Sequence, residues 1–315
     1  MSLERALELA ERGRGTTHPN PVVGAVIVRD GEVVGEGWHE RAGGPHAEVA
    51  ALEAAGDRAR GAALFVTMEP CLHHGRTPPC TERVLEGGIA RVVAGALDPD
   101  PEAGGGFERL RAAGVEVETA EGELAFRARQ QNEAWRTWVR LGRPFVTYKV
   151  AVTLDGHVSV PGSRWVSSEE SRRLVHELRA ASDAVAVGMG TVRADAPALT
   201  ARDVGAARQP RRLAFGRGPL PEGSELELRP GSLEQELGAL AEEGVQSLLL
   251  EGGPTLATAF LDADLVDKLL VFVAPTLGGM GPRFLGELGE PRRLSRFAAS
   301  PVGDDLLLSG YVHEP

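Results

Sequence analysis

The spacing of apolar residues in the first half of the chain alternates between the period of a helix and that of a strand. Two β-rich runs, residues 22–29 and 32–38, flank Asp30-Gly31, a dipeptide that favours a two-residue hairpin turn. Helical spacing predicts helices at the N-terminus, at residues 46–55, 107–113 and 121–141, and in a short segment after Pro79. Further strands are expected at residues 62–68, 91–96 and 115–118. This alternation predicts an α/β domain.

A second alternating series begins after Gly142-Arg143-Pro144, a sequence that ends the preceding helix. Its strands are predicted at residues 145–152, 184–187, 213–215, 247–250, 266–274 and 306–312, and its helices at residues 168–181, 232–243 and 254–261. This series predicts a second three-layer α/β domain. We therefore expect two domains, residues 1–143 and residues 144–315, as the length of the chain suggests.

Composition narrows the class of protein. Of 315 residues, 42% are hydrophobic and 25% are charged, so extended disorder and collagen-like repeats are excluded. The longest apolar runs are far shorter than the roughly 18 residues that span a bilayer, and no secretory leader opens the chain. We therefore expect a cytoplasmic protein without membrane contact. A net charge of -11 disfavours nucleic acid as a partner and favours a small substrate.

Cysteine, asparagine and lysine each occur at only two positions. The cysteines are Cys71 and Cys80, and their closeness in a reducing compartment favours a metal or catalytic role over a disulfide. Asparagine occurs at positions 20 and 132, and lysine at positions 149 and 268. Because arginine supplies nearly all the positive charge, a lysine can mark a place where the planar guanidinium does not serve.

The cysteines combine with a histidine and a glutamate into a candidate zinc site. His46-Ala47-Glu48 opens a predicted helix, and Pro70-Cys71 follows the next predicted strand. One imidazole and two thiolates suit Zn²⁺, and three protein ligands leave a fourth tetrahedral position for water. Glu48 is placed to take up a proton from that water and hand it on. This H-x-E and P-C pattern is typical of zinc deaminases, although eight residues rather than two separate the cysteines here.

A structural zinc site with four protein ligands is the alternative, with His18, His39, His73 or His74 as the fourth donor. Glu48 and the Pro-Cys turn favour the open, catalytic site. Substitution of Glu48 by alanine separates the two hypotheses. An open site would keep its metal and lose turnover, whereas a structural site would lose neither zinc nor folding.

The second half holds two candidates for a dinucleotide site. Residues 184–190 predict a strand that runs into G-x-G, but Arg193 stands where the Rossmann fingerprint needs a third glycine. Residues 248–255 are the stronger candidate. There an apolar strand ends in Glu-Gly-Gly, and Pro254 begins a helix whose free N–H groups would face a pyrophosphate. The alternative is a tight strand-to-helix turn without a ligand.

Three segments of the first half resemble the deaminase half of the bifunctional riboflavin-biosynthesis deaminase/reductases. They are residues 17–24 (THPNPVVG), 44–48 (GPHAE) and 69–80 (EPCLHHGRTPPC). The long spacing between the cysteines is the spacing of this family. The resemblance implies a cytidine-deaminase-like three-layer fold. It also implies that the zinc ligands are His46, Cys71 and Cys80, and that the proton shuttle is Glu48.

The same resemblance implies contacts with the substrate. Asn20 and His39 would contact the pyrimidine, whereas His73 and Arg76 would hold the 5′-phosphate of the ribose. His73 and Arg76 lie in the insertion between the two cysteines. An insertion beside the metal is a suitable place for a cationic phosphate pocket.

Four segments of the second half resemble the reductase half of the family, which has a dihydrofolate reductase-like α/β fold. They are residues 149–156 (KVAVTLDG), 163–168 (SRWVSS), 190–200 (GTVRADAPALT) and 251–256 (EGGPTL). The resemblance implies NADPH contacts for Ala151, Trp165, Thr191, Asp195, Gly253, Pro254, Thr255, Leu256, Ala257, Thr258 and Ala259. It implies substrate contacts for Ser163, Leu199, Arg202 and Glu251. Lys149 and Asp195 are the polar candidates near the reacting carbon.

One departure from the family lies at the end of the strand predicted at residues 213–215. Relatives have an Asp-Ser pair there, whereas this chain has Gly216-Arg217, so Arg217 would meet the 2′-phosphate of NADPH instead. The segment between residues 203 and 232 is also shorter than in the family, which alters the rim of the cofactor site more than the chemistry. The family further implies a homodimer formed through the reductase domain.

The expected function is two successive reactions on one phosphorylated pyrimidine. Zinc-dependent hydrolytic deamination of 2,5-diamino-6-ribosylamino-4(3H)-pyrimidinone 5′-phosphate would be followed by NADPH-dependent reduction of the ribosyl group to ribityl. The alternatives are a nucleoside or tRNA deaminase fused to an unrelated domain, a zinc-stabilised binding module without turnover, and a chain whose reductase half is inactive or differently specific. Ammonia release and the salt dependence of tRNA binding distinguish them.

Overall fold

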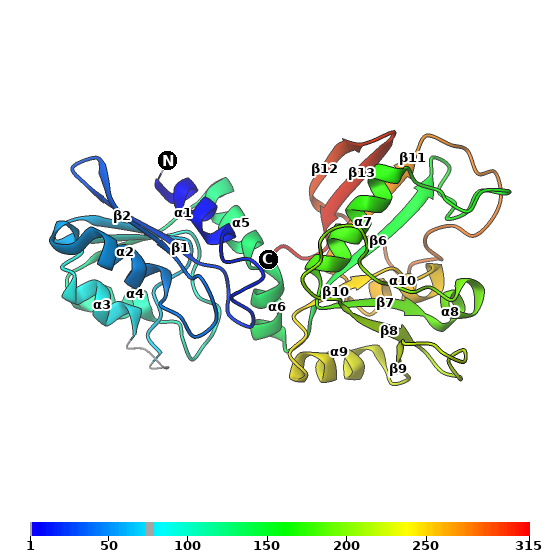
Figure 1. The fold of residues 1–315 in the computed structure, drawn as a ribbon, viewed down its shortest axis with the longest axis horizontal. Helices are drawn as coiled ribbons and strands as arrows, with labels where there is room; N and C mark the ends of the chain where they lie inside the picture. The colour runs from blue at the N-terminus through cyan, green and yellow to red at the C-terminus, as the bar shows by residue number, and fades with distance from the viewer. Residues whose placement is uncertain (1, 74–78) are drawn as a thin grey trace. The chain divides into compact units, whose positions relative to one another are not determined.

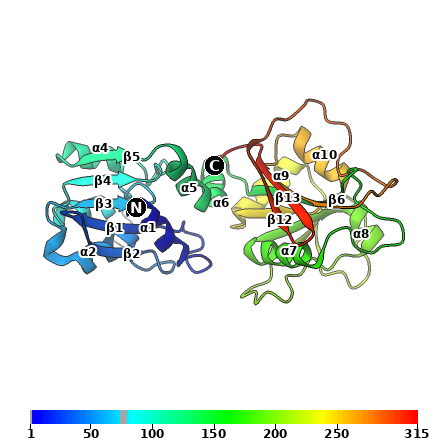
Figure 2. The same cartoon turned by 90° about the horizontal axis from the view of Figure 1, so that it is seen from above.

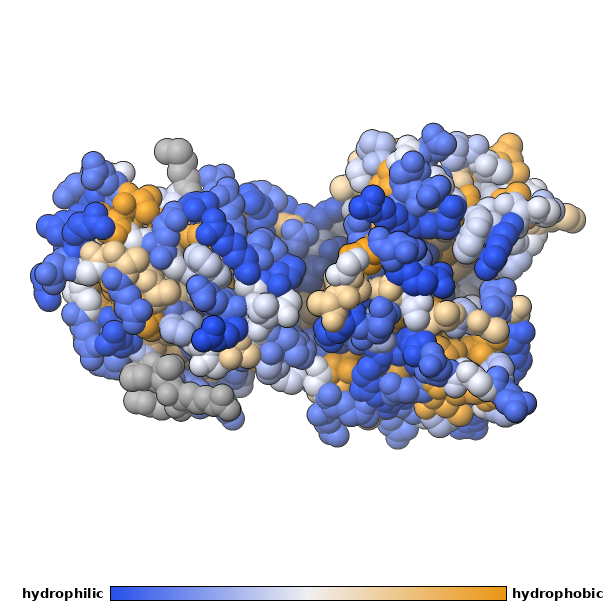
Figure 3. Space-filling model, viewed as in Figure 1, coloured by the Kyte–Doolittle hydropathy of each residue, from blue (hydrophilic) through white to orange (hydrophobic). Residues whose placement is uncertain are grey.

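The computed structural model describes residues 2–73 and 79–315, and the chain divides into two compact units (Figure 1). The first unit is Met1–Leu141 with Pro315, and the second is Gly142–Glu314. Both units combine a β-sheet with flanking helices, so the predicted α/β class is confirmed. Polar side chains cover most of the face shown in Figure 3. In the described residues, no helix is both long enough and apolar enough to span a membrane.

The first unit is built on a five-stranded sheet. Its strands are β1 (Gly24–Arg29), β2 (Glu32–Trp38), β3 (Ala63–Val66), β4 (Arg91–Ala94) and β5 (Glu116–Thr119). They lie in the order β2-β1-β3-β4-β5, with β1 antiparallel to both neighbours and the other pairs parallel (Figure 2). Asp30 and Gly31 have φ of 51° and 84°, as the two central residues of a type I′ turn require. The predicted hairpin is therefore confirmed.

Helices cover both faces of this sheet. They are α1 (Ser2–Glu11), α2 (Ala47–Ala55), α3 (Cys80–Glu86), α4 (Gly106–Ala112), α5 (Gly122–Gln131) and α6 (Glu133–Leu141), with a 3-10 turn at Gly56–Ala59. Successive side chains of a strand point to opposite faces. Ala25 and Ile27 accordingly pack against α2, α3 and α4, whereas Val26 packs against α1. The result is the three-layer arrangement that the sequence predicts.

The single helix predicted over residues 121–141 is wrong, because the structure interrupts it at Asn132. The buried Asn132 side chain accepts a hydrogen bond from the Val22 N–H and donates one to the Val22 carbonyl, each 2.9 Å long. Asparagine side chains that bond to backbone groups compete with helical hydrogen bonding. The interruption fixes the start of α6 to the segment that precedes β1.

The second unit contains an eight-stranded sheet. Its strands are β6 (Phe145–Thr153), β7 (Ala184–Gly188), β8 (Arg211–Phe215), β9 (Glu227–Arg229), β10 (Ser247–Leu250), β11 (Lys268–Ala274), β12 (Ser295–Val302) and β13 (Asp305–Tyr311). The order is β12-β13-β11-β6-β10-β7-β8-β9. The six neighbouring strands β11, β6, β10, β7, β8 and β9 run parallel to one another. The strand β13 pairs antiparallel with both β11 and β12.

Four helices flank this second sheet: α7 (Glu169–Ala181), α8 (Met189–Asp195), α9 (Leu233–Glu242) and α10 (Pro254–Asp262). Leu237 of α9 and Phe260 of α10 pack against one face, while Leu178 of α7 and Val192 of α8 pack against the other (Figure 1). Because both faces are covered, every residue of β7 is buried, which is the usual state of a central parallel strand.

In the second unit, three elements were not predicted from the sequence: α8, β9 and β12. The middle six residues of β12 are all exposed, so this edge strand lacks the apolar alternation that would predict it. The strand β9 has only three residues. The helix α8 occupies the segment that resembled a G-x-G turn, and Arg193 lies within it.

Candidate functional site

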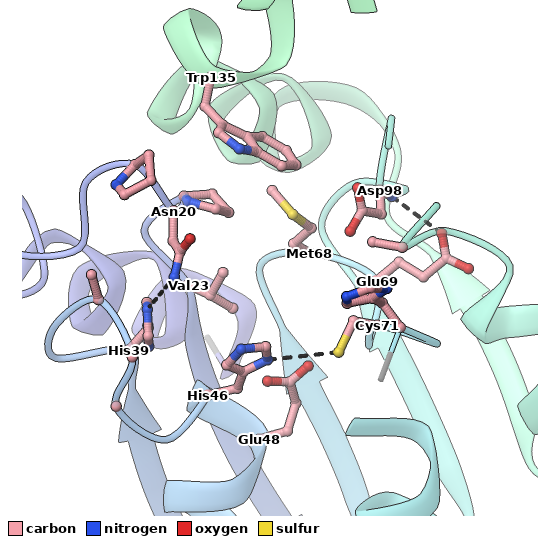
Figure 4. Close-up of a pocket in the computed structure, with 17 residues that line it drawn as sticks. Asn20, Val23, His39, His46, Glu48, Met68, Glu69, Cys71, Asp98 and Trp135 are labelled. Carbon is pink, nitrogen blue, oxygen red and sulfur yellow. Dashed lines mark hydrogen bonds between the residues drawn. The ribbon is translucent and has the colours of Figure 1, made fainter. Parts of the chain in front are cut away.

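A cavity of about 510 Å³ opens in the first unit where β3 and β4 end (Figure 4). Such volumes are typical of sites for small ligands. Its lining includes six residues that the sequence analysis assigned to metal, proton transfer or substrate: Asn20, His39, His46, Glu48, Cys71 and His73. These residues come from four separate segments of the chain, and the fold brings them together around one space.

Three potential metal ligands lie close together, and two of them, His46 and Cys71, line this cavity. His46 immediately precedes α2, Cys71 follows β3, and Cys80 is the first residue of α3. The His46 Nδ1 atom is 3.1 Å from Cys80 Sγ and 3.6 Å from Cys71 Sγ. All three donor atoms lie within 4.8 Å of one another. No further histidine, cysteine or carboxylate joins this group among the described residues.

The donor set fits zinc. Zinc–ligand bonds of about 2.1 Å to nitrogen and 2.3 Å to sulfur place neighbouring donor atoms of a tetrahedron roughly 3.5–3.8 Å apart. The observed separations from His46 Nδ1 are close to this range. Three protein donors leave one tetrahedral position open, and this is the arrangement of catalytic rather than structural zinc sites.

The two thiols differ in acidity because they share one small buried space. Hydrogen bonds from Cys80 and His46 hold the pKa of Cys71 well below its ordinary value, although burial opposes this effect. The pKa of Cys80 is raised, because its thiol donates to Cys71 Sγ and is buried. The Cys80 backbone N–H also points at Cys71 Sγ, at 3.5 Å. The Cys71 sulfur is thus held as a thiolate, which is the form that binds a metal.

Glu48 lies one residue into α2 and reaches the same cavity. Only 3% of the residue is exposed, and burial together with the neighbouring Cys71 raises the pKa of its carboxyl to about 7. Figure 4 shows the Glu48 carboxylate next to the His46 ring and on the side of Cys71. A buried carboxyl with a pKa near neutrality can both accept and donate a proton.

Asn20 and His39 form a second polar pair on the wall of the cavity. The Nδ1 atom of His39 donates to the Pro45 carbonyl at 2.9 Å, and its Nε2 atom accepts from Asn20 Nδ2 at 3.3 Å. Burial lowers the pKa of His39, so the ring is neutral and its tautomer is set by these two partners. The pair is oriented before any ligand binds.

Of the two predicted phosphate contacts, His73 falls within the described residues. His73 is exposed and lines the cavity. Arg76 lies outside the described residues. Residues 69–73 follow β3, so His73 stands on the same segment as the metal ligand Cys71.

Sequence reasoning missed several cavity residues, among them Asp98, Glu69, Met68 and Trp135. Asp98 follows β4, next to the Glu69-Pro70-Cys71 segment that follows the parallel neighbour β3. Polar residues at the carboxyl ends of adjacent parallel strands were the available signal, because such ends meet at one edge of the sheet. Burial raises the pKa of Asp98 to about 6.

The turn that carries Cys71 is fixed by Glu69 and Gly106. The Glu69 carboxylate accepts hydrogen bonds from the backbone N–H groups of Phe107 and Asp98, at 2.8 and 3.1 Å. At Gly106, a Cβ atom would stand 1.9 Å from the Pro70 carbonyl oxygen. The close approach of α4 to this turn therefore requires glycine, and it positions the first thiolate.

In the second unit, Lys149 and Glu251 lie close together on the segments of two neighbouring parallel strands. Lys149 is on β6, Glu251 follows β10, and Lys149 Nζ is 3.5 Å from Glu251 Oε2. Arg179 of α7 completes this group, with its guanidinium bonded to both carboxylate oxygens. Burial raises the pKa of Glu251, but the charges of Lys149 and Arg179 outweigh it and hold this pKa below its usual value.

Arg179 was not singled out from the sequence, although it joins two groups of predicted residues. Besides Glu251, its guanidinium donates to the Thr200 carbonyl at 3.2 Å. The segment with the predicted substrate residues Leu199 and Arg202 is thereby tied to Glu251. No signal in the single sequence identifies Arg179, because the last turn of an amphipathic helix is usually solvated.

The predicted pyrophosphate site lies where α10 begins. Gly253 precedes the helix in an extended conformation, and Pro254 is its first residue. A Cβ atom at Gly253 would stand 3.5 Å from Thr191 Oγ1, so the start of α10 adjoins the first turn of α8. Pro254, Thr255, Leu256, Ala257, Thr258 and Ala259 all lie on α10. Of these, Ala257 is fully buried in the core, so its side chain does not face a ligand site.

The other predicted cofactor residues are more dispersed. Ala151 is on β6, and Asp195 is the last residue of α8. Trp165 is 51% exposed, with the guanidinium carbons of Arg164 and Arg172 at 4.9 and 5.1 Å from its ring centre. Ser163 donates to the Trp165 carbonyl at 2.8 Å.

Arg217 follows β8, as the sequence analysis places it. Its carbonyl accepts a hydrogen bond from the Arg193 guanidinium at 3.1 Å. Arg193 belongs to α8, so this bond joins the loop after β8 to the helix after β7. In the described residues, neither guanidinium forms an ion pair with a carboxylate.

Comparisons with known proteins agree with this geometry. The RibD C-terminal domain family matches residues 144–308, and the family of the cytidine and deoxycytidylate deaminase zinc-binding region matches residues 2–96. The riboflavin biosynthesis protein RibD of Aquifex aeolicus is 40% identical over an alignment of 345 positions, and the alignment covers 97% of this chain and 96% of the relative. RibD of Mycobacterium tuberculosis (strain H37Rv) is 42% identical over 324 residues, covering 96% of this chain and 94% of the relative.

Solved structures of full-length relatives have the same fold. Acinetobacter baumannii RibD superimposes with a TM-score of 0.85 at 34% identity, covering 98% of this chain and 97% of that protein. A deaminase/reductase from Thermotoga maritima superimposes with a TM-score of 0.83 at 35% identity, with the same coverage. Both halves of the chain are matched in the same order over nearly their whole length. The chain therefore belongs to the RibD family of bifunctional riboflavin-biosynthesis deaminase/reductases.

Proposed function

We propose that the first unit deaminates 2,5-diamino-6-ribosylamino-4(3H)-pyrimidinone 5′-phosphate and that the second unit then reduces the ribosyl group to ribityl. The observation that carries this proposal is the open set of three zinc donors beside the buried Glu48. A binding module would need neither an open metal position nor a buried carboxyl with a pKa near neutrality. The Thermotoga maritima relative is named for the same pair of activities.

In the deamination, the side chains of the cavity orient the substrate and move a proton. His46, Cys71 and Cys80 hold zinc, which makes a water molecule nucleophilic when it is bound. Glu48 takes a proton from the attacking water and delivers it to the departing amino group, so that ammonia leaves and a carbonyl remains. Asn20 and His39 hold the pyrimidine, and their hydrogen bond fixes the direction of both side chains.

The phosphate of the substrate requires positive charge at the edge of the cavity. We assign this contact to His73, which lines the cavity, and to Arg76 in the insertion between the cysteines. An arginine suits this contact because its planar fork matches a phosphate.

In the reduction, NADPH supplies hydride to C1′ of the opened ribosyl group when it is bound. The start of α10 provides free N–H groups for the pyrophosphate, with Thr191 beside it. Further cofactor contacts are assigned to Ala151, Trp165, Asp195 and Arg217. We assign Lys149 and Asp195 to the surroundings of the reacting carbon, and Glu251, Ser163, Leu199 and Arg202 to the substrate.

We further propose that the protein works in the cytoplasm as a homodimer joined through the second unit, without nucleic-acid or membrane partners. Apolar side chains at the surface of β12 and β13 support an interface there: Phe297 is 61% exposed and Leu306 is 49% exposed. The net charge of -11 opposes nucleic acid binding. Light scattering should give the mass of two chains for the wild type and of one chain for Phe297→Asp.

Mass spectrometry of the products tests both activities together. Incubation of the pyrimidinone phosphate without NADPH should give a product in which one amino group has become a carbonyl, with ammonia released. Addition of NADPH should add two hydrogen atoms to that product. Ammonia release without the later mass change would mean that the reductase unit is inactive, and the absence of both would overturn the proposal.

A further inference from the structure

The helix α6 connects two opposite walls of the deaminase cavity. At its start, Asn132 makes two buried hydrogen bonds to the backbone of Val22, on the segment that also carries Asn20. One turn later, the Arg136 guanidinium donates to the Leu97 carbonyl at 2.9 Å, directly before the cavity residue Asp98. The helix is therefore fixed to both walls.

Trp135 lies between these two anchoring residues in the sequence of α6. Residues three apart share one face of a helix, so Trp135 follows Asn132 on the same side, and of the three residues Trp135 is the one that lines the cavity. Only 9% of Trp135 is exposed, and it belongs to the lining of the cavity. Figure 4 shows its indole at the end of the cavity opposite His46 and Glu48, with Met68 between them.

The position of Trp135 indicates which part of the substrate it can contact. The carbon that loses its amino group must lie beside Glu48, at the metal end of the cavity. The ribosyl group would then extend away from the metal end, along the part of the cavity where Met68 and Trp135 provide apolar surface. An indole offers a rigid, flat surface that loses little conformational entropy when a ligand packs on it.

We propose that Trp135 packs against the ribosyl group and thereby makes the deaminase selective for the ribosylated nucleotide over the free pyrimidine. Trp135 is a specificity-determining residue on this view, whereas Asn132 and Arg136 are positioning residues that act through it. The proposal rests on the proposed deaminase function of the first unit.

Removal of the indole should separate binding from chemistry. The hydrogen bonds that fix α6 come from Asn132 and Arg136, so they persist in Trp135→Ala. The Michaelis constant for the ribosylated phosphate should rise roughly tenfold, because a buried aromatic contact is lost, while kcat changes little. Trp135→Phe should retain part of the effect and guards against failure of the alanine variant to fold.

A truncated substrate makes the test specific. The free base 2,5,6-triamino-4(3H)-pyrimidinone has the reacting carbon but no ribosyl phosphate, so Trp135→Ala should leave its kcat/KM unchanged. The matched control is Trp138→Phe, on the same helix but not in the cavity lining. It should leave both substrates unaffected.

Equal losses for the two substrates would show a structural role for Trp135 and overturn the proposal, as would no loss for either. Zinc content measured on every variant should stay at the wild-type level; a lower content in Trp135→Ala would also count as a structural effect. If the wild-type protein releases ammonia from neither compound, the proposed function fails, and the inference falls with it.

Discussion

Glu251 accepts hydrogen bonds from Arg179 through both carboxylate oxygens: Arg179 Nε lies 2.6 Å from Oε1, and Nη2 lies 2.9 Å from Oε2. The two side chains are only 9% and 14% exposed. Lys149 supplies a second positive charge to the same carboxylate, at 3.5 Å. Three charged groups that are largely shielded from water therefore lie together, and two of them, Lys149 and Glu251, are assigned to the reductase site.

Arg179→Ala should leave the Glu251 carboxylate with Lys149 as its remaining cation. Loss of one partner from a buried ion pair is costly, because the other charge stays buried, and we expect a loss of about 2 kcal/mol in the stability of the second unit. NADPH-dependent reduction should fall, whereas deamination should be unaffected. Urea denaturation and separate assays of the two reactions check this. Unchanged stability would show that the ion pair of Arg179 with Glu251 does not stabilise the second unit.

Glu48→Gln should abolish deamination without loss of zinc. The amide keeps the shape of the side chain but cannot carry the proton, so kcat should drop by roughly 10²- to 10⁴-fold. Zinc measured by mass spectrometry should stay at the wild-type level, because the three donors are unchanged. Glu53→Gln, at an exposed position of the same helix, is the control and should retain full activity. Zinc loss in Glu48→Gln would contradict the assigned role.

The rarest residues of the chain were the most informative ones in its sequence. Cys71 and Cys80 are the only cysteines, and their chemistry together with His46 and Glu48 predicts one place where they must meet. The structure brings the three donors within 4.8 Å. Continuous apolar runs also predicted most of the central strands, because a strand that is buried on both faces has apolar residues at successive positions.

The features that the sequence did not predict depend on contacts between distant parts of the chain. The break at Asn132 depends on the Val22 backbone, which lies far away in the sequence. Arg179 reads as a solvated position at the end of an amphipathic helix, and Trp135 reads as an ordinary core residue. Their roles become visible only when Glu251 and the cavity are placed beside them.

Gly106→Ala should reduce the zinc affinity of the first unit, although Gly106 is not a zinc ligand. The added Cβ would stand 1.9 Å from the Pro70 carbonyl oxygen, so the turn that carries Cys71 must move. We expect reduced zinc affinity and a loss of about 1–3 kcal/mol in stability, as for other overpacked positions. Competition with a chromogenic chelator measures the affinity.

Gly238→Ala is the control for Gly106→Ala. Gly238 lies inside α9 with open space around the position of a Cβ atom. Alanine there should leave zinc binding unchanged and raise stability by about 0.5–1 kcal/mol, because glycine is unfavourable inside a helix. Wild-type zinc affinity in Gly106→Ala would mean that the turn adapts without moving Cys71.

Arg217→Ala should weaken binding of NADPH but not of NADH. The two cofactors differ only in the 2′-phosphate, which we assign to the guanidinium of Arg217, a residue whose carbonyl is bonded to Arg193. Loss of a charge-assisted contact should raise the Kd for NADPH roughly tenfold or more. Fluorescence titration with each reduced cofactor measures both constants. Arg212→Ala is the control, since that guanidinium is paired with Glu225. An equal change for NADPH and NADH would place the 2′-phosphate elsewhere.

His313→Gln should reduce the stability of the second unit in acid but not in alkali. The ring lies 3.3 Å from Asp267 Oδ1 and 3.2 Å from Asp264 Oδ2, and the hydrogen bond to Asp267 raises the pKa of His313. Arg143, which also pairs with Asp267, and Arg292, which pairs with Asp264, are the other charged groups of this cluster.

Because the folded pKa is raised, protonated His313 contributes stability below its unfolded pKa of about 6.5 and loses that contribution as the pH rises through the folded value. The side chain is 36% exposed, so water screens the pair and we expect an effect of about 0.5 kcal/mol. Urea denaturation near pH 5.5 and pH 8.5 measures it. The glutamine variant should be less stable than the wild type at the lower pH and equally stable at the higher pH, and a cost of the same size at both would refute the assignment.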